Sequence, residues 1–186
     1  AHSDFPRCGS TSYSSVLSAL EAGKNVEWYL EIGSRSGASV ALRKCNFIAV
    51  DPEFKIKADV FNDASNMFFC QQTSDDFFKQ NVLGKLSVKP GLTFIDGMHL
   101  FEFALRDFIN AEKAMNNDGV ICFHDVCPFS YEMTTRDVSY LDQGLPWTGD
   151  VWKVIQVLLE YRPDLTVDVV NARKTGIGCV SGLDPK

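Results

Sequence analysis

Acidic and imidazole side chains lie close together in two short segments of the sequence. FIDGMH contains Asp96 and His99, and CFHD contains His124 and Asp125. Two carboxylates with water oxygens suit a hard divalent cation such as Mg²⁺, and an imidazole, with a pKa of about 6.5, suits a general base beside it. The two segments are therefore candidates for a cation site with an adjacent base.

A second candidate site is EIGSRSG, residues 31–37, in which glycines enclose small serines. Small residues let backbone N–H groups approach a ligand at the start of a helix. Asp51 ends the next predicted strand, about where an acid accepts hydrogen bonds from ribose hydroxyls in Rossmann-like sites. Arg35 occupies the second glycine position of the G-x-G-x-x-G fingerprint, which disfavours an NAD-linked oxidoreductase. A nucleoside-containing ligand is favoured, and an ordinary strand-to-helix turn is the alternative.

Hydrophobic patterning predicts alternating strands and helices. Near-continuous apolar strands belong to a parallel sheet with helices on both faces, so we predict an α/β, Rossmann-like, seven-stranded, mostly parallel sheet whose last strand is antiparallel. The predicted strands are 26–33, 46–52, 66–73, 92–97, 119–126, 165–170 and 176–180, the last two being edge strands, and the predicted helices are 13–23, 37–44, 75–83, 101–115 and 151–158.

The predicted elements bring the candidate residues together. Right-handed crossovers place the C-terminal ends of parallel strands along one rim, where ligands bind in such sheets. Gly33, Asp51, Thr73, Asp96 and Asp125 each lie at or just after a strand end and should converge there. The segment 127–149 is long for a connection in a compact domain, and such loops are often lids or binding loops. We therefore predict that this segment determines which acceptor molecule the site binds.

EIGSRSG resembles the first motif, E-x-G-x-x-x-G, of class I S-adenosylmethionine-dependent methyltransferases. I-D-G-x-H followed by a strand ending in H-D is similar to a branch that includes macrolide-sugar and cephalosporin-pathway O-methyltransferases, and the resemblance covers residues 26–126. It implies that Asp96 and Asp125 hold Mg²⁺ and that His99 takes the proton of an acceptor hydroxyl. Related sequences often carry two adjacent acids where this one has His124 and Asp125, so another divalent cation, or no metal, is the alternative.

The site residues that the resemblance implies fall into three groups. His99 is the catalytic base, and the metal ligands are Asp96, Asp125 and, as a further candidate, His124. Structural alternatives are a plain turn at Asp96, a helix cap at 73–75, and a buried or supporting role for His124. The residues implied to bind S-adenosylmethionine are Glu31, Gly33, Ser34, Ser36, Gly37, Asp51, Pro52, Thr73, Ser74, Asp75, Asp96, Gly97 and Met98.

Composition limits the partners. The 186 residues, of which 45% are hydrophobic, predict a single domain over 1–186, and the net charge of −6 favours a small-molecule or saccharide-like acceptor over nucleic acid. The first residues are polar rather than signal-like, no apolar run is long enough to span a membrane, and the scattered cysteines, Cys8 included, favour reduced thiols. We expect a cytoplasmic enzyme, with a homo-oligomer as a possible state and a non-catalytic cofactor-binding module as the alternative function.

Overall fold

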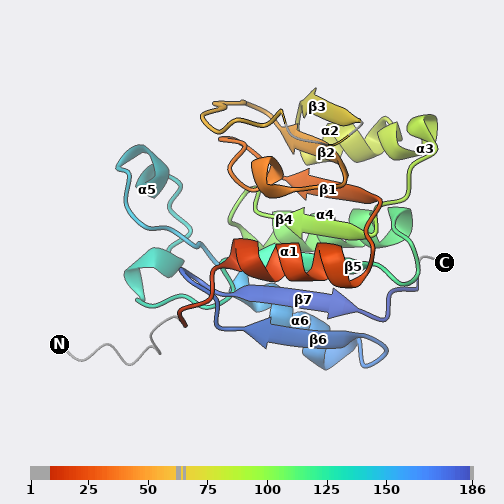
Figure 1. Cartoon of the computed structure of the whole chain (residues 1–186). Coiled ribbons are helices and arrows are strands. Elements are labelled where there is room, and N and C mark those ends of the chain that lie inside the picture. Colours follow the sequence, from red (N-terminus) through yellow and green to blue (C-terminus); the bar gives the residue numbers. More distant parts are fainter. Residues whose placement is uncertain (1–8, 62–63, 65, 185–186) are drawn as a thin grey trace.

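The computed structural model describes residues 9–61, 64 and 66–184, and within these a single sheet forms the centre (Figure 1). Its order is β3-β2-β1-β4-β5-β7-β6, in which neighbours from β3 to β5 are parallel and β7 is antiparallel to both β5 and β6. The predicted sheet is confirmed, but β7 lies inside it rather than at an edge. The strands are β1 (Trp28–Ile32), β2 (Asn46–Asp51), β3 (Met67–Gln71), β4 (Leu92–Ile95), β5 (Val120–His124), β6 (Thr166–Val170) and β7 (Ile177–Ser181).

Helices cover both faces of the sheet, but unequally. One face carries α2, α3, α4 and α6, which pack on clusters around Phe77 and Phe108, whereas α1 packs on the other face through Leu17. In Figure 1, α1 lies in front of the sheet and the other four lie behind it. The helices are α1 (Tyr13–Gly23), α2 (Ser74–Lys79), α3 (Val82–Leu86), α4 (Phe101–Ala114), α5 (Ser139–Asp142) and α6 (Trp152–Tyr161), with 3-10 turns η1 (Val40–Leu42) and η2 (Glu132–Thr134).

The helix predicted at 37–44 is wrong, because the chain forms only the 3-10 turn η1 there. The connection must return along the length of β1, whose five residues extend about 16 Å. Residues 37–45 would cover only about 13 Å as an α-helix, at about 1.5 Å per residue. The segment is therefore too short to be helical throughout.

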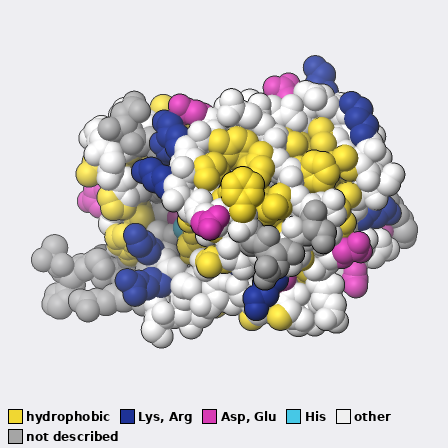
Figure 2. All heavy atoms as spheres, turned by 45° about the horizontal axis from the view of Figure 1, so that its top comes forward, with side chains coloured by type: hydrophobic (Ala, Val, Ile, Leu, Met, Phe, Trp, Pro, Cys, Tyr) yellow, Lys and Arg dark blue, Asp and Glu magenta, His cyan; other side chains and the backbone are white. Residues whose placement is uncertain are grey.

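Because residues 37–44 form only a 3-10 turn, little regular structure covers the sheet face around β2 and β3. The segment between β2 and β3 forms no regular helix in its described residues, and its Val60 and Ile56 side chains pack against Gly37. Ile56, Phe61 and Phe69 remain exposed, and hydrophobic side chains gather on this side of the molecule (Figure 2). This region therefore leaves apolar surface in contact with solvent.

None of the helices in the described part of the chain combines the length and apolar character that crossing a membrane requires. Among the cysteines, Cys8 lies outside the described residues. Cys122 and Cys179 face each other across β5 and β7, with 3.7 Å between their Sγ atoms.

Candidate functional site

A cavity of about 860 Å³ opens where β1, β2, β4 and β5 end, beside the start of α2. The residues that were expected to converge at the strand ends, from Gly33 to Asp125, all line this cavity. Two of the predicted site residues, Glu31 and Gly37, are absent from its wall. The predicted residues that line it are Gly33, Ser34, Ser36, Asp51, Pro52, Thr73, Ser74, Asp75, Asp96, Gly97, Met98, His99, His124 and Asp125.

The turn after β1 needs glycine at both ends. Gly33 has a φ of +91°, and a Cβ there would lie 2.0 Å from the backbone oxygen of Asp96. Gly37 has a φ of +76°, and its Cβ would lie 2.6 Å from Cγ1 of Val60. Gly33 therefore lets the turn approach the end of β4, while Gly37 packs outward against the segment after β2 rather than lining the cavity.

Glu31 lies beneath the cavity. Its side chain accepts hydrogen bonds from the hydroxyls of Tyr29 at 2.6 Å and Ser39 at 2.7 Å, and the residue is 1% exposed. Burial raises the pKa of Glu31 to about 7, against the opposing effect of these hydrogen bonds. Glu31 therefore does not line the cavity itself but holds Ser39, which does, and its contact with the cofactor stays a prediction.

Asp51 fixes the other side of the turn. One carboxylate oxygen accepts a hydrogen bond from the backbone N–H of Arg35 and the other accepts from that of Glu53, both at 2.8 Å. Arg35 has a φ of +24°, a conformation that is unusual for a residue with a side chain. Asp51 thus holds the turn in shape, and its contact with a ribose stays a prediction.

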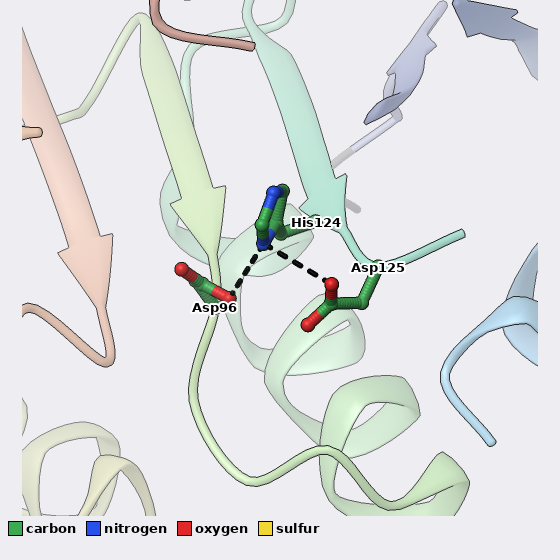
Figure 3. Close-up of side chains that lie close together, drawn as sticks. All are labelled: Asp96, His124 and Asp125. Carbon is green, nitrogen blue, oxygen red and sulfur yellow. Dashed lines mark hydrogen bonds and ion pairs between the residues drawn. The ribbon is translucent and has the colours of Figure 1, made fainter. Parts of the chain in front are cut away.

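The predicted acid and imidazole groups meet at the ends of β4 and β5 (Figure 3). Nδ1 of His124 lies 3.1 Å from Oδ1 of Asp96 and 3.4 Å from Oδ1 of Asp125. One ligand atom from each of these three residues lies within 4.8 Å of the others. Asp125 has a φ of +62°, and such strained backbone is typical of functional sites. This geometry can hold one divalent cation.

Hydrogen bonds orient the ring nitrogens of both histidines. Nδ1 of His99 lies 2.9 Å from the backbone oxygen of Trp147, which can only accept, so Nδ1 is the donor and Nε2, 3.5 Å from Oδ1 of Asp96, faces the acid. Thr175 donates to Oδ1 of Asp125 at 2.5 Å, and its oxygen lies 3.4 Å from Nε2 of His124. The Thr175 oxygen can thus accept from Nε2 of His124, which leaves Nδ1 toward the acids.

The two acids keep both histidines protonated in the absence of a cation. Burial lowers the pKa of His99, but hydrogen bonding to Asp96 and the charges of Asp125 and Asp96 outweigh it and raise the pKa to about 9. For His124, burial is likewise outweighed by the charge of Asp96 and by bonds to both acids, and the pKa rises to about 11. Burial alone would raise the pKa of Asp96, yet the two histidines hold it well below its usual range. A cation that binds here must displace the proton of His124.

The segment 127–149 closes one side of the cavity. It contains η2 and α5, and it contributes apolar wall residues that include Phe129, Met133 and Trp147. The Trp147 ring stacks on the ring of His99, with 5.2 Å between centroids. Asp150, just after the segment, accepts a hydrogen bond from the backbone N–H of Phe101 at 2.7 Å and so caps α4. The segment is therefore fastened to the helix that follows His99.

Arg136 makes this attachment stronger. It pairs with Glu102 at 2.7 Å and with Asp150 at 2.7 Å. Arg106, one turn after Glu102 on α4, pairs instead with Asp75 on α2. Both charges found partners on other elements, which helical spacing cannot reveal.

The residues at the site that were not predicted as site residues include Thr175, Tyr13 and Asp107. Thr175 lies in the turn before β7, Tyr13 places its ring 4.5 Å from that of His124, and Asp107 on α4 lines the cavity. Tyr13 and Asp107 lie in segments whose apolar periodicity was interpreted as helix packing, which gave no reason to assign either residue to the site. No motif marks Thr175, since its role depends on β7 pairing with β5.

The strand order, with its antiparallel β7 and the glycine turn after β1, defines the fold of class I S-adenosylmethionine-dependent methyltransferases. Residues 30–126, which are 97 of the 186, match a family model described as a methyltransferase domain. The chain belongs to this methyltransferase family. Among curated protein sequences, none matches it.

Solved structures show the same fold at low sequence identity. Cofactor-bound Rv0187 from MTB has a TM-score of 0.64 and 14% identity, over 98% of this chain and 85% of that one. The O-methyltransferase from Bacillus cereus in complex with SAH has a TM-score of 0.59 and 15% identity, over 96% and 84%. MycE from the mycinamycin pathway, in complex with Mg, SAH and mycinamycin VI, has a TM-score of 0.60 and 12% identity, over 90% of this chain and 48% of that one.

Proposed function

We propose that this protein transfers the methyl group of S-adenosylmethionine to a hydroxyl of a small-molecule or saccharide-like acceptor, with the assistance of a divalent cation. The observation that carries the proposal is the group of Asp96, His99, His124 and Asp125 in the same cavity as the glycine turn after β1. The net charge of −6 disfavours nucleic acid as the acceptor. The acidic cluster and the cofactor complexes of structurally similar O-methyltransferases agree with this function.

The cavity fits the cofactor. Gly33 permits the close approach of the turn that any Cβ would block, and small side chains at Ser34 and Ser36 leave its backbone open to a ligand. In this proposal, Asp51 at the end of β2 binds the ribose of the cofactor, and residues 73–75 and 97–98 lie around its adenine. Asp107 adds a buried carboxyl to this wall, and an adenine amine can donate a hydrogen bond to that carboxyl.

The metal donor set also fits. Two carboxylates and one imidazole suit a divalent cation of borderline softness, such as Mn²⁺ or Zn²⁺, as well as Mg²⁺. Asp96, Asp125 and Nδ1 of His124 would hold it. Thr175 supports the set by accepting from Nε2 of His124, since such supporting bonds fix the tautomer of an imidazole ligand.

The chain's own residues then position and deprotonate the acceptor. S-adenosylmethionine supplies the electrophilic methyl group, and a bound cation supplies charge that lowers the pKa of a hydroxyl. Trp147 holds Nδ1 of His99 as a donor, so Nε2 is the nitrogen that would take the hydroxyl proton, once a cation on Asp96 and Asp125 offsets the charges that keep His99 protonated. The apolar wall of Phe129, Met133 and Trp147 excludes water and aligns the acceptor oxygen for in-line displacement.

The first test separates cofactor binding from chemistry. We expect calorimetry to show binding of S-adenosylhomocysteine, and labelled S-adenosylmethionine to methylate members of a panel of hydroxylated acceptors. His99→Gln should retain the binding but lower turnover by roughly 10²–10⁴-fold, because it removes the proton acceptor. Chelation should abolish turnover, and Mg²⁺, Mn²⁺ or Zn²⁺ should restore it.

Three outcomes contradict parts of this proposal. Unchanged turnover in His99→Gln removes the base assignment, and full turnover after chelation removes the cation. Binding of S-adenosylhomocysteine without turnover on any acceptor, with each cation supplied, favours a non-catalytic binding module.

A further inference from the structure

Asp107 is a buried carboxyl in the cavity wall with no part in the acidic cluster. It lies in the second turn of α4, is 3% exposed, and contributes to the lining of the cavity. Its Oδ2 lies 3.8 Å from the position that a Cβ on Gly97 would occupy, and Ser74 is near enough to lower the pKa of its carboxyl. Asp107 therefore stands between the loops that follow β3 and β4.

Among the residues that the structure describes, no cationic side chain forms an ion pair with this carboxyl. Its neighbour Arg106 binds Asp75 in a bidentate pair, with Nε to Oδ1 at 2.6 Å and Nη2 to Oδ2 at 2.7 Å. Burial, together with the charge of Asp75, raises the pKa of Asp107 to about 7, while Ser74 and the charge of Arg106 oppose the rise. A buried carboxyl without a charged partner is costly unless it has further hydrogen bonds to make.

The position of Asp107 suits the base of a bound nucleoside. Asp51 at the end of β2 marks the ribose in the proposed function, so the base extends toward Ser74 and Gly97. The exocyclic amine of adenine donates hydrogen bonds, and the adjacent ring nitrogen accepts one. Asp75 also lines this end, but Arg106 already binds both of its oxygens. Asp107 is buried and lacks the cationic partner that Asp75 has, so it is the carboxyl that gains more from a hydrogen bond with the amine.

We propose that Asp107, which lines the cavity beside Ser74, accepts a hydrogen bond from the 6-amino group of the cofactor's adenine and is the residue that selects adenine in this site. This inference rests on the proposed function, since it assumes that S-adenosylmethionine occupies the cavity. It assigns a specificity-determining role to a residue that takes no part in methyl transfer.

The test is a binding cycle between two ligands and four proteins. The ligands are S-adenosylhomocysteine and its analogue with hydrogen in place of the 6-amino group, measured by calorimetry. Wild type should prefer the amino ligand by about tenfold or more, because the analogue leaves a buried polar group without its partner. Asp107→Leu should bind the two ligands equally, and Asp107→Asn should retain the preference, because its amide oxygen still accepts from the amine.

Asp75→Leu is the matched control, since it removes the neighbouring carboxyl that Arg106 binds. It should keep the preference for the amino ligand. Equal binding by wild type, a retained preference in Asp107→Leu, or a preference lost in Asp75→Leu instead would each overturn the inference. If wild type does not bind S-adenosylhomocysteine at all, the proposed function fails first. A melting curve shows whether Asp107→Leu is folded, and Asp107→Ala replaces it if not.

Discussion

At the scale of single residues, Glu31 links the cofactor turn to stability. Its pKa of about 7 lies above its ordinary value of 4.5, so the folded protein binds this proton more tightly than the unfolded chain. The stability it contributes is greatest below pH 4.5 and is lost as the pH rises toward 7. Asp107, whose pKa is also raised to about 7, acts in the same direction.

We predict that Glu31→Gln reduces the pH dependence of the free energy of unfolding. Between pH 5 and 6.5, two such carboxyls lower that free energy by roughly 2–3 kcal/mol per pH unit, and removing one should halve the slope. Urea unfolding at several pH values measures it. Glu160→Gln, on the exposed side of α6, is the control and should leave the slope unchanged. An unaltered slope in Glu31→Gln would mean that Glu31 is ionised in the folded protein.

Residue types indicated the acidic site more accurately than the cofactor turn. Asp96, His99, His124 and Asp125 were predicted from strand ends, and the structure brings all four into one cavity. Glu31 and Gly37 were assigned to the binding surface, but the Glu31 side chain bonds to Tyr29 and Ser39 beneath the cavity, and Gly37 packs on Val60. Which face a strand-end residue occupies depends on register, and a motif does not record it.

At the scale of elements, the segment 127–149 and α4 act as one unit. Arg136 reaches Glu102 in the first turn of α4 and Asp150, which caps that helix. This unit carries both Trp147 and His99, whose rings stack. Movement of the segment therefore alters the acceptor side of the cavity while it leaves the glycine turn in place.

We predict that Arg136→Ala raises the KM for the acceptor by roughly fivefold and leaves S-adenosylhomocysteine affinity unchanged. Steady-state kinetics and calorimetry measure the two effects. Arg162→Ala is the matched control, because Arg162 also bridges two acids, Glu112 and Asp164, but it does not line the cavity. Equal KM changes in both variants would show that the effect is general destabilisation.

Helices and strands could be predicted where apolar residues repeat at a regular spacing. They could not be predicted where the length of a connection or the pairing of distant segments determines the structure. The strands and α4 follow apolar periodicity, and they form close to their predicted bounds. The 37–44 segment has helix-forming residues but too little length, and this becomes visible only when the strand that it must retrace is known. The insertion of β7 beside β5 likewise depends on pairing between distant segments.

At the scale of the whole molecule, α1 protects a face that has little other helical cover. Leu17 is fully buried in the cluster that joins α1 to Tyr29 and Phe94. Of the described helical elements, α1 and η1 are those that contribute to this cluster. Loss of packing by α1 cannot be compensated by a neighbouring helix on that face.

We predict that Leu17→Ala lowers the free energy of unfolding by about 3 kcal/mol, since it removes a buried side chain and leaves a cavity. Urea denaturation measures it as a lower midpoint. Leu159→Ala on α6, where the leucine is 60% exposed, should cost less than about 0.5 kcal/mol. Similar losses in the two variants would mean that α1 packs weakly.

The position of β7 between β5 and β6 has a consequence for synthesis on the ribosome. The strand that joins β6 to the rest of the sheet is made after every other strand, so β5 has an unpaired edge until residues 177–181 have left the exit tunnel. A nascent chain that pauses before this point presents an open β5 edge to other nascent chains. Completion of the sheet is therefore a late event in biosynthesis, after the residues that line the cavity have already been made.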